Sequence, residues 1–375
     1  MTLTIGSIWA ARRAAPCLNG SMSPASPWCE TQAAIFRIEG TREKGMTVRQ
    51  VNLPGTGMES SVLGFGCASL GSRISRKTGL RSLEQAYEAG VTWYDVAPPY
   101  GAGEAEPILG EFLKGRRDRV RICTKVGLTP PERNGVMRLA YAVARPLVGH
   151  IKGLRQRFRS MPSTRYQKAA LDAGTIMASI DRSLSRLKTD HVDVFALHDP
   201  AEADVVSDEI LRVLETILSS GKARHLSVGG TLAACRAAVG PNLPFGVVQF
   251  ADDPRLSALA EIQAAAARPV ATITHSVFGV AGAHERLVAR LRSEPAAARR
   301  LEAAGYGGGA ETAAAALLLD RAFASNASGV VLASMFSERN LRFNLDRASR
   351  PPAPASIGLV RDLIGGDVSD TSLPA

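Results

Sequence analysis

The 375-residue sequence predicts an α/β protein, a (β/α)8 TIM barrel with an N-terminal β-hairpin and long loops after strands 3 and 7. Strand-like and helix-like segments alternate without a break, which implies right-handed crossovers and a parallel sheet. The alternation has eight units, and eight favour closure into a barrel over an open doubly wound sheet. An apolar content of 45% is ample for a core of that size.

The sequence pattern divides the chain into three regions. Residues 1–45 have no sustained hydrophobic period and mix Pro, Ser and Gly with scattered charge, so we expect a disordered or mis-assigned N-terminal extension. The barrel is expected over residues 46–350, and a C-terminal tail over 351–375. Inside the barrel region, Gly55 and Gly57 lie between apolar residues and predict the small hairpin.

The expected strands are short runs rich in branched and aromatic residues, which favour extended backbone. They are Val62–Ala68, Val91–Asp95, Val120–Lys125, Val192–Leu197, Ala223–Val228, Phe245–Phe250, Val270–Thr274 and Gly329–Leu332. The expected helices lie between the strands and carry apolar residues at helical spacing. They are Leu80–Ala89, Glu104–Lys114, Thr175–Leu187, Ser207–Ser219, Thr231–Val239, Leu256–Ala266, Ala310–Ala324 and Glu338–Asp346.

Two stretches depart from the simple repeat, at residues 128–172 and 277–309. Each follows the end of an expected strand, so in a barrel both would lie on the carboxyl face, over any active site. Loops of this length are usually functional or disordered. Apolar residues spaced among the arginines of the first stretch suggest one or two short amphipathic helices.

The net charge of +10 is unevenly distributed along the chain. Residues 129–168 contain nine Lys or Arg and one Glu, while residues 1–45 contain five basic and three acidic groups. Residues 129–168 thus carry a net charge of +8 and residues 1–45 one of +2, so the rest of the chain is neutral. The basic character therefore comes from these two segments and says little about the barrel. Binding of nucleic acid through 129–168 is a minor alternative, because no RNA or DNA module is recognisable there. The segment could instead line the substrate mouth and favour anionic or phosphorylated compounds.

The five cysteines are odd in number, widely spaced and without a CxxC motif, which indicates reduced thiols and a cytoplasmic location. They are Cys17, Cys29, Cys67, Cys123 and Cys235. No uninterrupted apolar run approaches the roughly 18 residues that span a bilayer, so we expect no membrane partner. We also expect no secretory signal and no metal site.

Four titratable residues lie at or just beyond the ends of three consecutive expected strands. Asp95 ends the second strand, with Tyr100 in the loop just beyond it, while Lys125 ends the third strand and His198 the fourth. Pro98 and Pro99 stop the second strand, because proline lacks the donor that continues a ladder. Taken singly, each residue has an ordinary structural explanation. An Asp can cap a helix, for example, and a buried His can make its hydrogen bonds within the core. Together, at matching ends of parallel strands, they predict one shared site.

The chemistry of these four groups suits a carbonyl whose oxygen gains a proton while its carbon accepts hydride. A phenol has an unperturbed pKa of about 10, too high for ready proton exchange at neutral pH. We expect the Lys125 ammonium to lower the pKa of Tyr100, with Asp95 holding that ammonium in place. His198 would orient the carbonyl oxygen or relay a proton.

The sequence resembles the aldo-keto reductase family over residues 46–346. The resemblance rests on Leu63-Gly64-Phe65-Gly66, Tyr94-Asp95-Val96-Ala97 with Tyr100-Gly101, Glu106 with Leu109-Gly110, Thr124-Lys125-Val126-Gly127, Ser183–Leu187 with Asp190 and Val192-Asp193, and the His198 segment. It implies a catalytic tetrad of Asp95, Tyr100, Lys125 and His198. The segments around Pro98 and His198-Asp199-Pro200 resemble the branch of aldose and fucose dehydrogenases.

The resemblance implies an NADP cofactor, with NAD possible, bound in extended form at the carboxyl end of the barrel without a Rossmann fold. Gln249 matches the family's Gln that holds the nicotinamide amide, although a strand-end Gln can equally be a structural hydrogen-bonder. The remaining candidates for cofactor binding are His275, Ser276, Ser334, Ser337, Arg339 and Asn344. The last four could hold the adenosine phosphates at a helix start, or simply cap that helix.

Three features depart from the family pattern. Gly229-Gly230 stands where the family often has Ser-Asn, and His275 stands where many members have an aromatic that stacks on the nicotinamide. The Lys that often meets the 2′-phosphate has no counterpart, and Arg339 could substitute for it.

The sequence therefore predicts an NAD(P)(H)-dependent oxidoreductase that interconverts a small carbonyl compound or sugar and its alcohol, with Tyr100 as the general acid or base. The alternative is a cofactor-binding sensor or regulatory barrel with little turnover, which the departures at Gly229-Gly230 and His275 favour and the complete tetrad disfavours. The sequence makes no prediction of oligomeric state.

Overall fold

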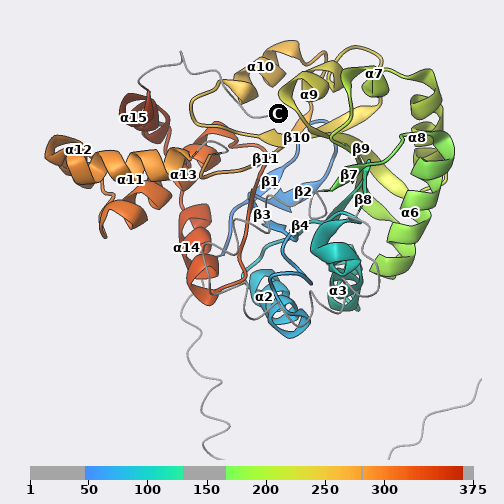
Figure 1. Cartoon of the computed structure of the whole chain (residues 1–375), viewed down its shortest axis with the longest axis horizontal. Helices are drawn as coiled ribbons and strands as arrows, with labels where there is room; N and C mark the ends of the chain where they lie inside the picture. The colour runs from blue at the N-terminus through green and yellow to red at the C-terminus, as the bar shows by residue number, and fades with distance from the viewer. Residues whose placement is uncertain (1–46, 130–165, 280–281, 366–375) are drawn as a thin grey trace, which may run out of the picture. The chain divides into compact units, whose positions relative to one another are not determined.

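A computed structural model of the chain describes residues 47–129, 166–279 and 282–365. The expected N-terminal extension and most of the basic segment 129–168 lie outside the described residues. Eight parallel strands close into a barrel in the order β10-β11-β12-β3-β4-β5-β8-β9, and helices surround it (Figure 1). The predicted (β/α)8 barrel is confirmed.

All eight expected barrel strands are present, with ends shifted by at most two residues. They are β3 (Leu63–Gly66), β4 (Trp93–Asp95), β5 (Arg121–Val126), β8 (Val192–His198), β9 (Ala223–Gly230), β10 (Phe245–Ala251), β11 (Ala271–His275) and β12 (Val330–Ala333). Their register places His198 opposite Gly229, which in turn pairs with Gln249, so these positions share one level at the carboxyl end.

Each helix that follows a barrel strand has buried apolar residues. These helices are α2 (Arg76–Glu88), α3 (Ala105–Phe112), α6 (Ala173–Leu187), α8 (Asp208–Ser219), α9 (Leu232–Ala238), α10 (Ala258–Ala265), α13 (Ala310–Ser325) and α14 (Glu338–Ser349). In α8, for example, Ile210, Leu214 and Ile217 are buried at helical spacing. The helix α2 begins four residues earlier than expected, because Ser75 caps it by accepting a hydrogen bond from the Thr78 amide.

The predicted hairpin is also confirmed, as β1 (Gln50–Asn52) paired antiparallel with β2 (Glu59–Ser61). Leu53 and Met58, from its turn, are buried in a small apolar cluster with Trp93 and Val330 from inside the barrel. The hairpin therefore contributes to the apolar filling of the barrel, next to residues that begin strands β4 and β12. The carboxyl ends of the strands are left for polar side chains.

Two regions contain helices that the sequence pattern did not predict. The stretch 277–309 contains α11 (Ala283–Ser293) and α12 (Pro295–Ala303), and the expected tail contains α15 (Ala355–Ile364). Helix α15 packs against α13 and α11 through its buried residues Val360 and Leu363 (Figure 1). Each of these helices is short, with 11, 9 and 10 residues in α11, α12 and α15, and its stability depends on tertiary contacts that a local pattern does not reveal.

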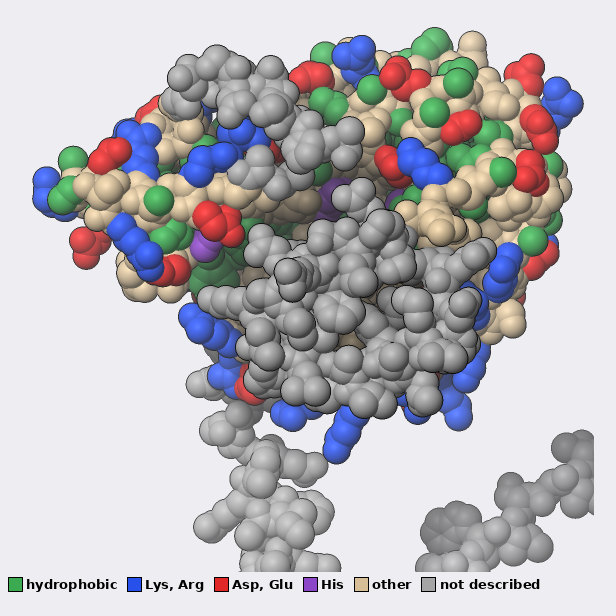
Figure 2. All heavy atoms as spheres, in the orientation of Figure 1, with side chains coloured by type: hydrophobic (Ala, Val, Ile, Leu, Met, Phe, Trp, Pro, Cys, Tyr) green, Lys and Arg blue, Asp and Glu red, His purple; other side chains and the backbone are tan. Residues whose placement is uncertain are grey.

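The ends of the long loop 128–172 are held together by a short antiparallel pair, β6 (Leu128–Thr129) with β7 (Gln167–Lys168). Figure 2 shows charged side chains of both signs on one face of the molecule, with Lys and Arg gathered over α2 and α3. Among the described helices, none is long and apolar enough to cross a membrane.

Candidate active site

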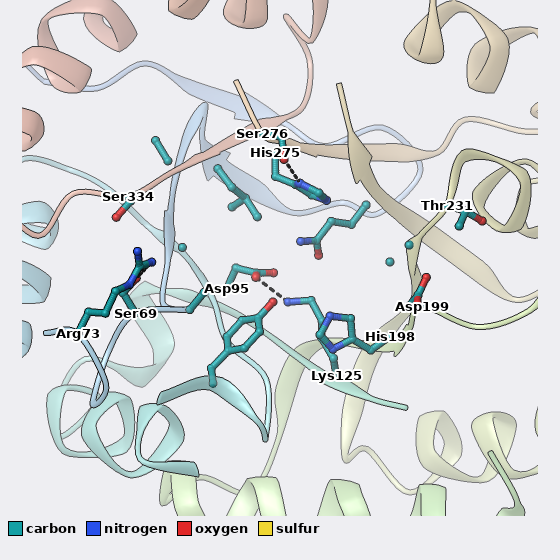
Figure 3. A pocket seen from close by; sticks show the side chains of 18 residues that line it. Ser69, Arg73, Asp95, Lys125, His198, Asp199, Thr231, His275, Ser276 and Ser334 are labelled. Atoms are coloured by element: carbon teal, nitrogen blue, oxygen red, sulfur yellow. Dashed lines mark hydrogen bonds and ion pairs between the residues drawn. The ribbon is translucent and has the colours of Figure 1, made fainter. Parts of the chain in front are cut away.

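A cavity of about 580 Å³ lies at the carboxyl end of the barrel (Figure 3). Every one of the eight barrel strands, or the loop that follows it, contributes a lining residue. All four residues of the predicted tetrad line this cavity, together with Gln249, His275, Ser276 and Ser334. The convergence of parallel strand ends explains why residues far apart in the sequence meet here.

A buried ion pair joins Asp95 to Lys125 at the base of the cavity. The Lys125 Nζ lies 2.5 Å from Asp95 Oδ1 and also donates to the Val96 carbonyl at 3.2 Å. The Lys125 side chain is only 1% exposed, and the Asp95 side chain is 4% exposed. Burial lowers the pKa of Lys125, but the charge and hydrogen bond of Asp95, together with Tyr100 and Cys123, raise that pKa above its usual value. Lys125 is therefore an ammonium at neutral pH.

Tyr100 stands beside this ion pair, at the start of the 3-10 turn η2 (Tyr100–Gly103). Its ring centroid is 5.2 Å from Lys125 Nζ, and 5.9 Å from the imidazole centroid of His198 in an edge-on arrangement. The next residue, Gly101, has φ +63°, and a Cβ there would lie 1.8 Å from the Leu70 carbonyl oxygen. Only glycine fits this approach, so the turn that presents the phenol is sterically determined.

The pKa of Tyr100 differs from the sequence-based expectation. Burial raises it to about 12, while the ammonium of Lys125 acts in the opposite direction. The expected effect of Lys125 is therefore present, but desolvation of the phenolate outweighs it. Tyr100 is a neutral phenol at pH 7, which is the proton-donating form.

His198, at the end of β8, is a neutral imidazole. Burial, and then the positive charge of Lys125 and the neighbouring His275, lower its pKa to about 3. Its Nδ1 is buried and has no hydrogen-bond partner among the described residues. A neutral ring beside Tyr100 can orient a carbonyl oxygen by hydrogen bonding without competing for the phenol proton.

Four of the predicted cofactor residues border the same cavity on the β10, β11 and β12 side. Gln249 is 5% exposed, and its buried Oε1 lacks a partner within the described part of the chain. His275 Nδ1 lies 2.9 Å from Ser276 Oγ, which fixes the two side chains relative to each other. Ser334 follows β12 directly.

The other three predicted cofactor residues are not among those that line the cavity. Ser337 caps α14, since its Oγ accepts from the Asn340 amide at 3.2 Å. Arg339 is exposed on the first turn of α14, and Asn344 is buried within that helix. Ser337 therefore caps this helix, and its role in cofactor binding stays a prediction.

Four polar lining residues were missed by sequence reasoning: Ser69, Arg73, Asp199 and Thr231. The first two lie in the loop after β3, and the last two follow β8 and β9 directly. The sequence did carry one signal for these residues: they follow the ends of expected strands, and such positions border the carboxyl face of a barrel. Asp199 has φ +55° and pairs with Lys168, whose Nζ lies 3.1 Å from both the carboxylate and the carbonyl oxygen.

The glycine pair after β9 has different surroundings at its two positions. A Cβ at Gly230 would lie 2.9 Å from Asp199 Cα, which is closer than real Cβ contacts. At Gly229 the nearest atom would be Gln249 Cβ at 3.6 Å, an ordinary contact. The glycine at 230 is therefore explained by the close approach of the Asp199 backbone.

Fold and site together define a (β/α)8 barrel protein with a cluster of titratable side chains at its carboxyl face. The model described as "Aldo/keto reductase family" matches residues 62–255 of the chain. The chain belongs to the aldo/keto reductase family.

Individual relatives agree with this assignment. The chain is 28% identical over 179 residues to Aldo-keto reductase YhdN of Bacillus subtilis, covering 46% of this chain and 44% of that protein. It is 31% identical over 188 residues to D-threo-aldose 1-dehydrogenase of a Pseudomonas species, covering 47% and 52%. The matched part thus spans about half the length of these relatives. The solved aldo-keto reductase AKR11C1 from Bacillus halodurans has the same fold, with a TM-score of 0.62, 18% identity, and coverage of 86% and 99%.

Proposed function

We propose that the protein is an NAD(P)(H)-dependent oxidoreductase that interconverts a small aldehyde, ketone or aldose and the corresponding alcohol. The observation that carries this proposal is the gathering of Tyr100, the Lys125–Asp95 pair and a neutral His198 around one cavity. A neutral proton donor, a fixed cation beside it and an orienting imidazole are what carbonyl reduction requires of a protein.

A nicotinamide dinucleotide fits the residues on the β10, β11 and β12 side. The buried Oε1 of Gln249 has no partner in the described chain, and it could accept a hydrogen bond from a carboxamide N–H. The hydroxyls of Ser276 and Ser334 border the same cavity and could contact the polar parts of the dinucleotide. When bound, the reduced nicotinamide supplies hydride, and the protein supplies position and protons.

The protein's own residues then have distinct roles in carbonyl reduction. His198 holds the carbonyl oxygen close to Tyr100, whose phenol donates its proton to that oxygen as negative charge develops. Lys125 stabilises the phenolate that remains, and Asp95 keeps Lys125 in place. In alcohol oxidation the same groups act in reverse, with the phenolate as the base.

The relatives support an aldehyde or sugar as the substrate. Besides D-threo-aldose 1-dehydrogenase, they include proteins named Pyridoxal 4-dehydrogenase, from Microbacterium luteolum, and L-galactose dehydrogenase, from Arabidopsis thaliana. A cytoplasmic location belongs to the same proposal. It is supported by Cys67, Cys123 and Cys235, which are free and buried.

The test combines cofactor binding with turnover in a Tyr100→Phe variant. Wild-type protein is titrated with NADPH and NADH by fluorescence and then assayed on a panel of aldehydes, ketones and aldoses. Tyr100→Phe should lower kcat/KM by about 10²- to 10⁴-fold, since it removes the general acid, while cofactor affinity stays within about threefold. Tyr87→Phe is the matched control, because Tyr87 lies on α2 and does not line the cavity.

Two results would count against this assignment. Normal turnover in Tyr100→Phe would remove the proton donor from the scheme. Cofactor binding by the wild type without conversion of any member of the panel would favour the alternative, a cofactor-binding sensor.

A further inference from the structure

The cavity wall contains a carboxylate that the proposed reaction does not use, that of Asp199. Figure 3 shows Asp199 and Thr231 on the side of His198 that faces away from the Asp95–Lys125 pair. Asp95 is buried and paired with Lys125, whereas the Asp199 side chain is 37% exposed. Asp199 is therefore the carboxylate that a ligand of this cavity can reach.

Asp199 is held in an unusual backbone conformation. Its φ of +55° lies in the left-handed region, which residues with a side chain seldom adopt, although Asp tolerates it better than most. Its amide donates to the Gly229 carbonyl over 2.6 Å, and its carbonyl accepts from Lys168 Nζ at 3.1 Å. Strained residues of this kind persist where surrounding contacts fix them, and they cluster at ligand-binding sites. The direction of the Asp199 carboxylate is therefore set by its neighbours.

The glycine at position 230 leaves the room that Asp199 occupies. A Cβ at Gly230 would lie 2.9 Å from Asp199 Cα and 3.3 Å from Asp199 Oδ1, so a side chain there would displace the carboxylate. The φ of Gly230 lies outside the left-handed region, so its own backbone conformation does not require glycine. Gly230 and Asp199 thus form a matched pair, in which the missing side chain gives the carboxylate its place in the cavity wall.

The carboxylate keeps hydrogen-bonding capacity for a ligand. Lys168 Nζ lies 3.1 Å from Asp199 Oδ2, and Oδ1 has no partner among the residues that the structure describes. An ionised carboxylate can accept about four hydrogen bonds, and an ion pair this exposed is weak. The Thr231 hydroxyl accepts from the Ala234 amide at 3.2 Å, so its own proton is available to a ligand. An acceptor and a hydroxyl on the same side of the cavity match the hydroxyl groups of a ligand.

The rest of the cavity wall has few large apolar groups. Among the lining residues in the described part of the chain, Leu332 is the only large aliphatic side chain and Tyr100 the only phenyl ring. The others are polar side chains, glycines and alanines. Pockets for apolar ligands are lined mainly by aliphatic and aromatic side chains, so this wall favours a substrate that carries hydroxyl groups.

We propose that Asp199 is a specificity-determining residue of this cavity, whose carboxylate accepts a hydrogen bond from a hydroxyl group of a polyhydroxylated carbonyl substrate. Thr231 contacts the same part of the substrate. The reacting carbonyl lies between Tyr100 and His198, so the recognised hydroxyl lies further along the carbon chain, on the far side of His198. This inference rests on the proposed function and narrows its substrates to hydroxylated aldehydes and ketones over simple alkyl ones.

The experiment compares Asp199→Asn with a matched control, Asp181→Asn. Asn keeps the shape of the side chain and tolerates the left-handed backbone, but it loses the charge. Asp181 also pairs with a lysine at the surface, Lys222, and does not line the cavity. Values of kcat/KM at saturating NADPH are measured for the D- and L-aldopentoses and for pentanal, a five-carbon aldehyde without hydroxyl groups. Each value is divided by that of the wild type, which cancels differences in the intrinsic reactivity of the substrates.

In Asp199→Asn, the loss of kcat/KM on the best aldopentose should exceed the loss on pentanal by at least about tenfold, the usual effect of losing a charge-assisted hydrogen bond. The difference should appear mainly as a raised KM, and Asp181→Asn should not show it. Lys168→Met removes the ion pair but keeps the carboxylate, so it should retain the wild-type discrimination. Gly230→Ala displaces the carboxylate and should reduce the discrimination as Asp199→Asn does.

Two results would overturn the assignment of Asp199. Equal losses on the aldopentoses and pentanal, at an unchanged melting temperature, would leave Asp199 with a structural role. A loss of NADPH affinity in fluorescence titration, without a difference between the substrates, would assign the carboxylate to the dinucleotide.

Calorimetric titration with xylitol, in the absence of cofactor, separates this inference from the proposed function. Xylitol binding that is weakened in Asp199→Asn, in a protein that converts none of the aldehydes, would keep the hydroxyl site and refute the oxidoreductase. Turnover of the aldehydes, with xylitol bound equally by the wild type and Asp199→Asn and with no change in discrimination, would keep the oxidoreductase and refute the hydroxyl site.

Discussion

Replacing Lys125 by methionine tests the buried ion pair most directly. At 2.5 Å and an effective dielectric constant of about 20, the attraction between Lys125 and Asp95 is about 7 kcal/mol, from which the desolvation of both groups must be subtracted. Removing one partner leaves a carboxylate that is 4% exposed and whose other oxygen has no hydrogen-bond partner among the described residues. We expect Lys125→Met to lower the free energy of unfolding by about 3–5 kcal/mol.

The double variant Asp95→Asn/Lys125→Met separates charge from packing. With both charges gone, no uncompensated carboxylate remains, so most of the lost stability should return. Turnover should not return, because Tyr100 has lost the cation that stabilises its phenolate. Both variants should show kcat/KM reduced by about 10²- to 10⁴-fold. Lys222→Met is the matched control, since Lys222 pairs with Asp181 over the same 2.5 Å but is 30% exposed. Loss of this exposed ion pair should lower the free energy of unfolding by only about 0–1 kcal/mol.

Urea unfolding followed by tryptophan fluorescence measures these differences, because Trp93 is fully buried inside the barrel. Equal stability losses in Lys125→Met and Lys222→Met would refute the reasoning, and so would a double variant no more stable than Lys125→Met. Retained turnover in Lys125→Met would show that the cation is not needed by Tyr100.

Three further predictions follow from the same site. His198 binds a proton at about pH 6.5 when unfolded and only at about pH 3 when folded, so the free energy of unfolding should fall as pH drops between these values, by up to about 1.4 kcal/mol per pH unit. The variant His198→Gln should flatten this slope in pH-dependent urea unfolding, and an unchanged slope would be contrary evidence. Gln249→Leu removes a buried oxygen that has no partner in the described part of the chain, so stability should hold while NADPH affinity in fluorescence titration falls about tenfold. Unaltered NADPH affinity would exclude the carboxamide contact. In chemical denaturation, Gly230→Ala should lower the free energy of unfolding by about 1–3 kcal/mol because its Cβ clashes with the Asp199 backbone, and Gly229→Ala should lower it distinctly less. The reverse order of the two variants would contradict this steric explanation.

The sequence was sufficient for the barrel because eight periodic strand–helix units admit few arrangements. It was sufficient to place Asp95, Tyr100, Lys125 and His198 at one cavity, because parallel strands in a barrel all end on one face. The catalytic roles of these four residues stay a prediction. It was not sufficient for helix α15, whose formation depends on contacts with α13 and α11. Local pattern carries no information on such distant partners.

What the sequence alone determined is therefore the closed parallel barrel and the identity of the groups at its mouth. The tertiary structure alone decided their environment: burial sets the pKa of Tyr100 at about 12 despite the nearby Lys125, and that of His198 at about 3. It also decided that Arg73 and Asp199 line opposite sides of the cavity. The physical reason is that desolvation and loop path depend on atoms brought together from all eight strands, whereas strand order and strand ends follow from the chain itself.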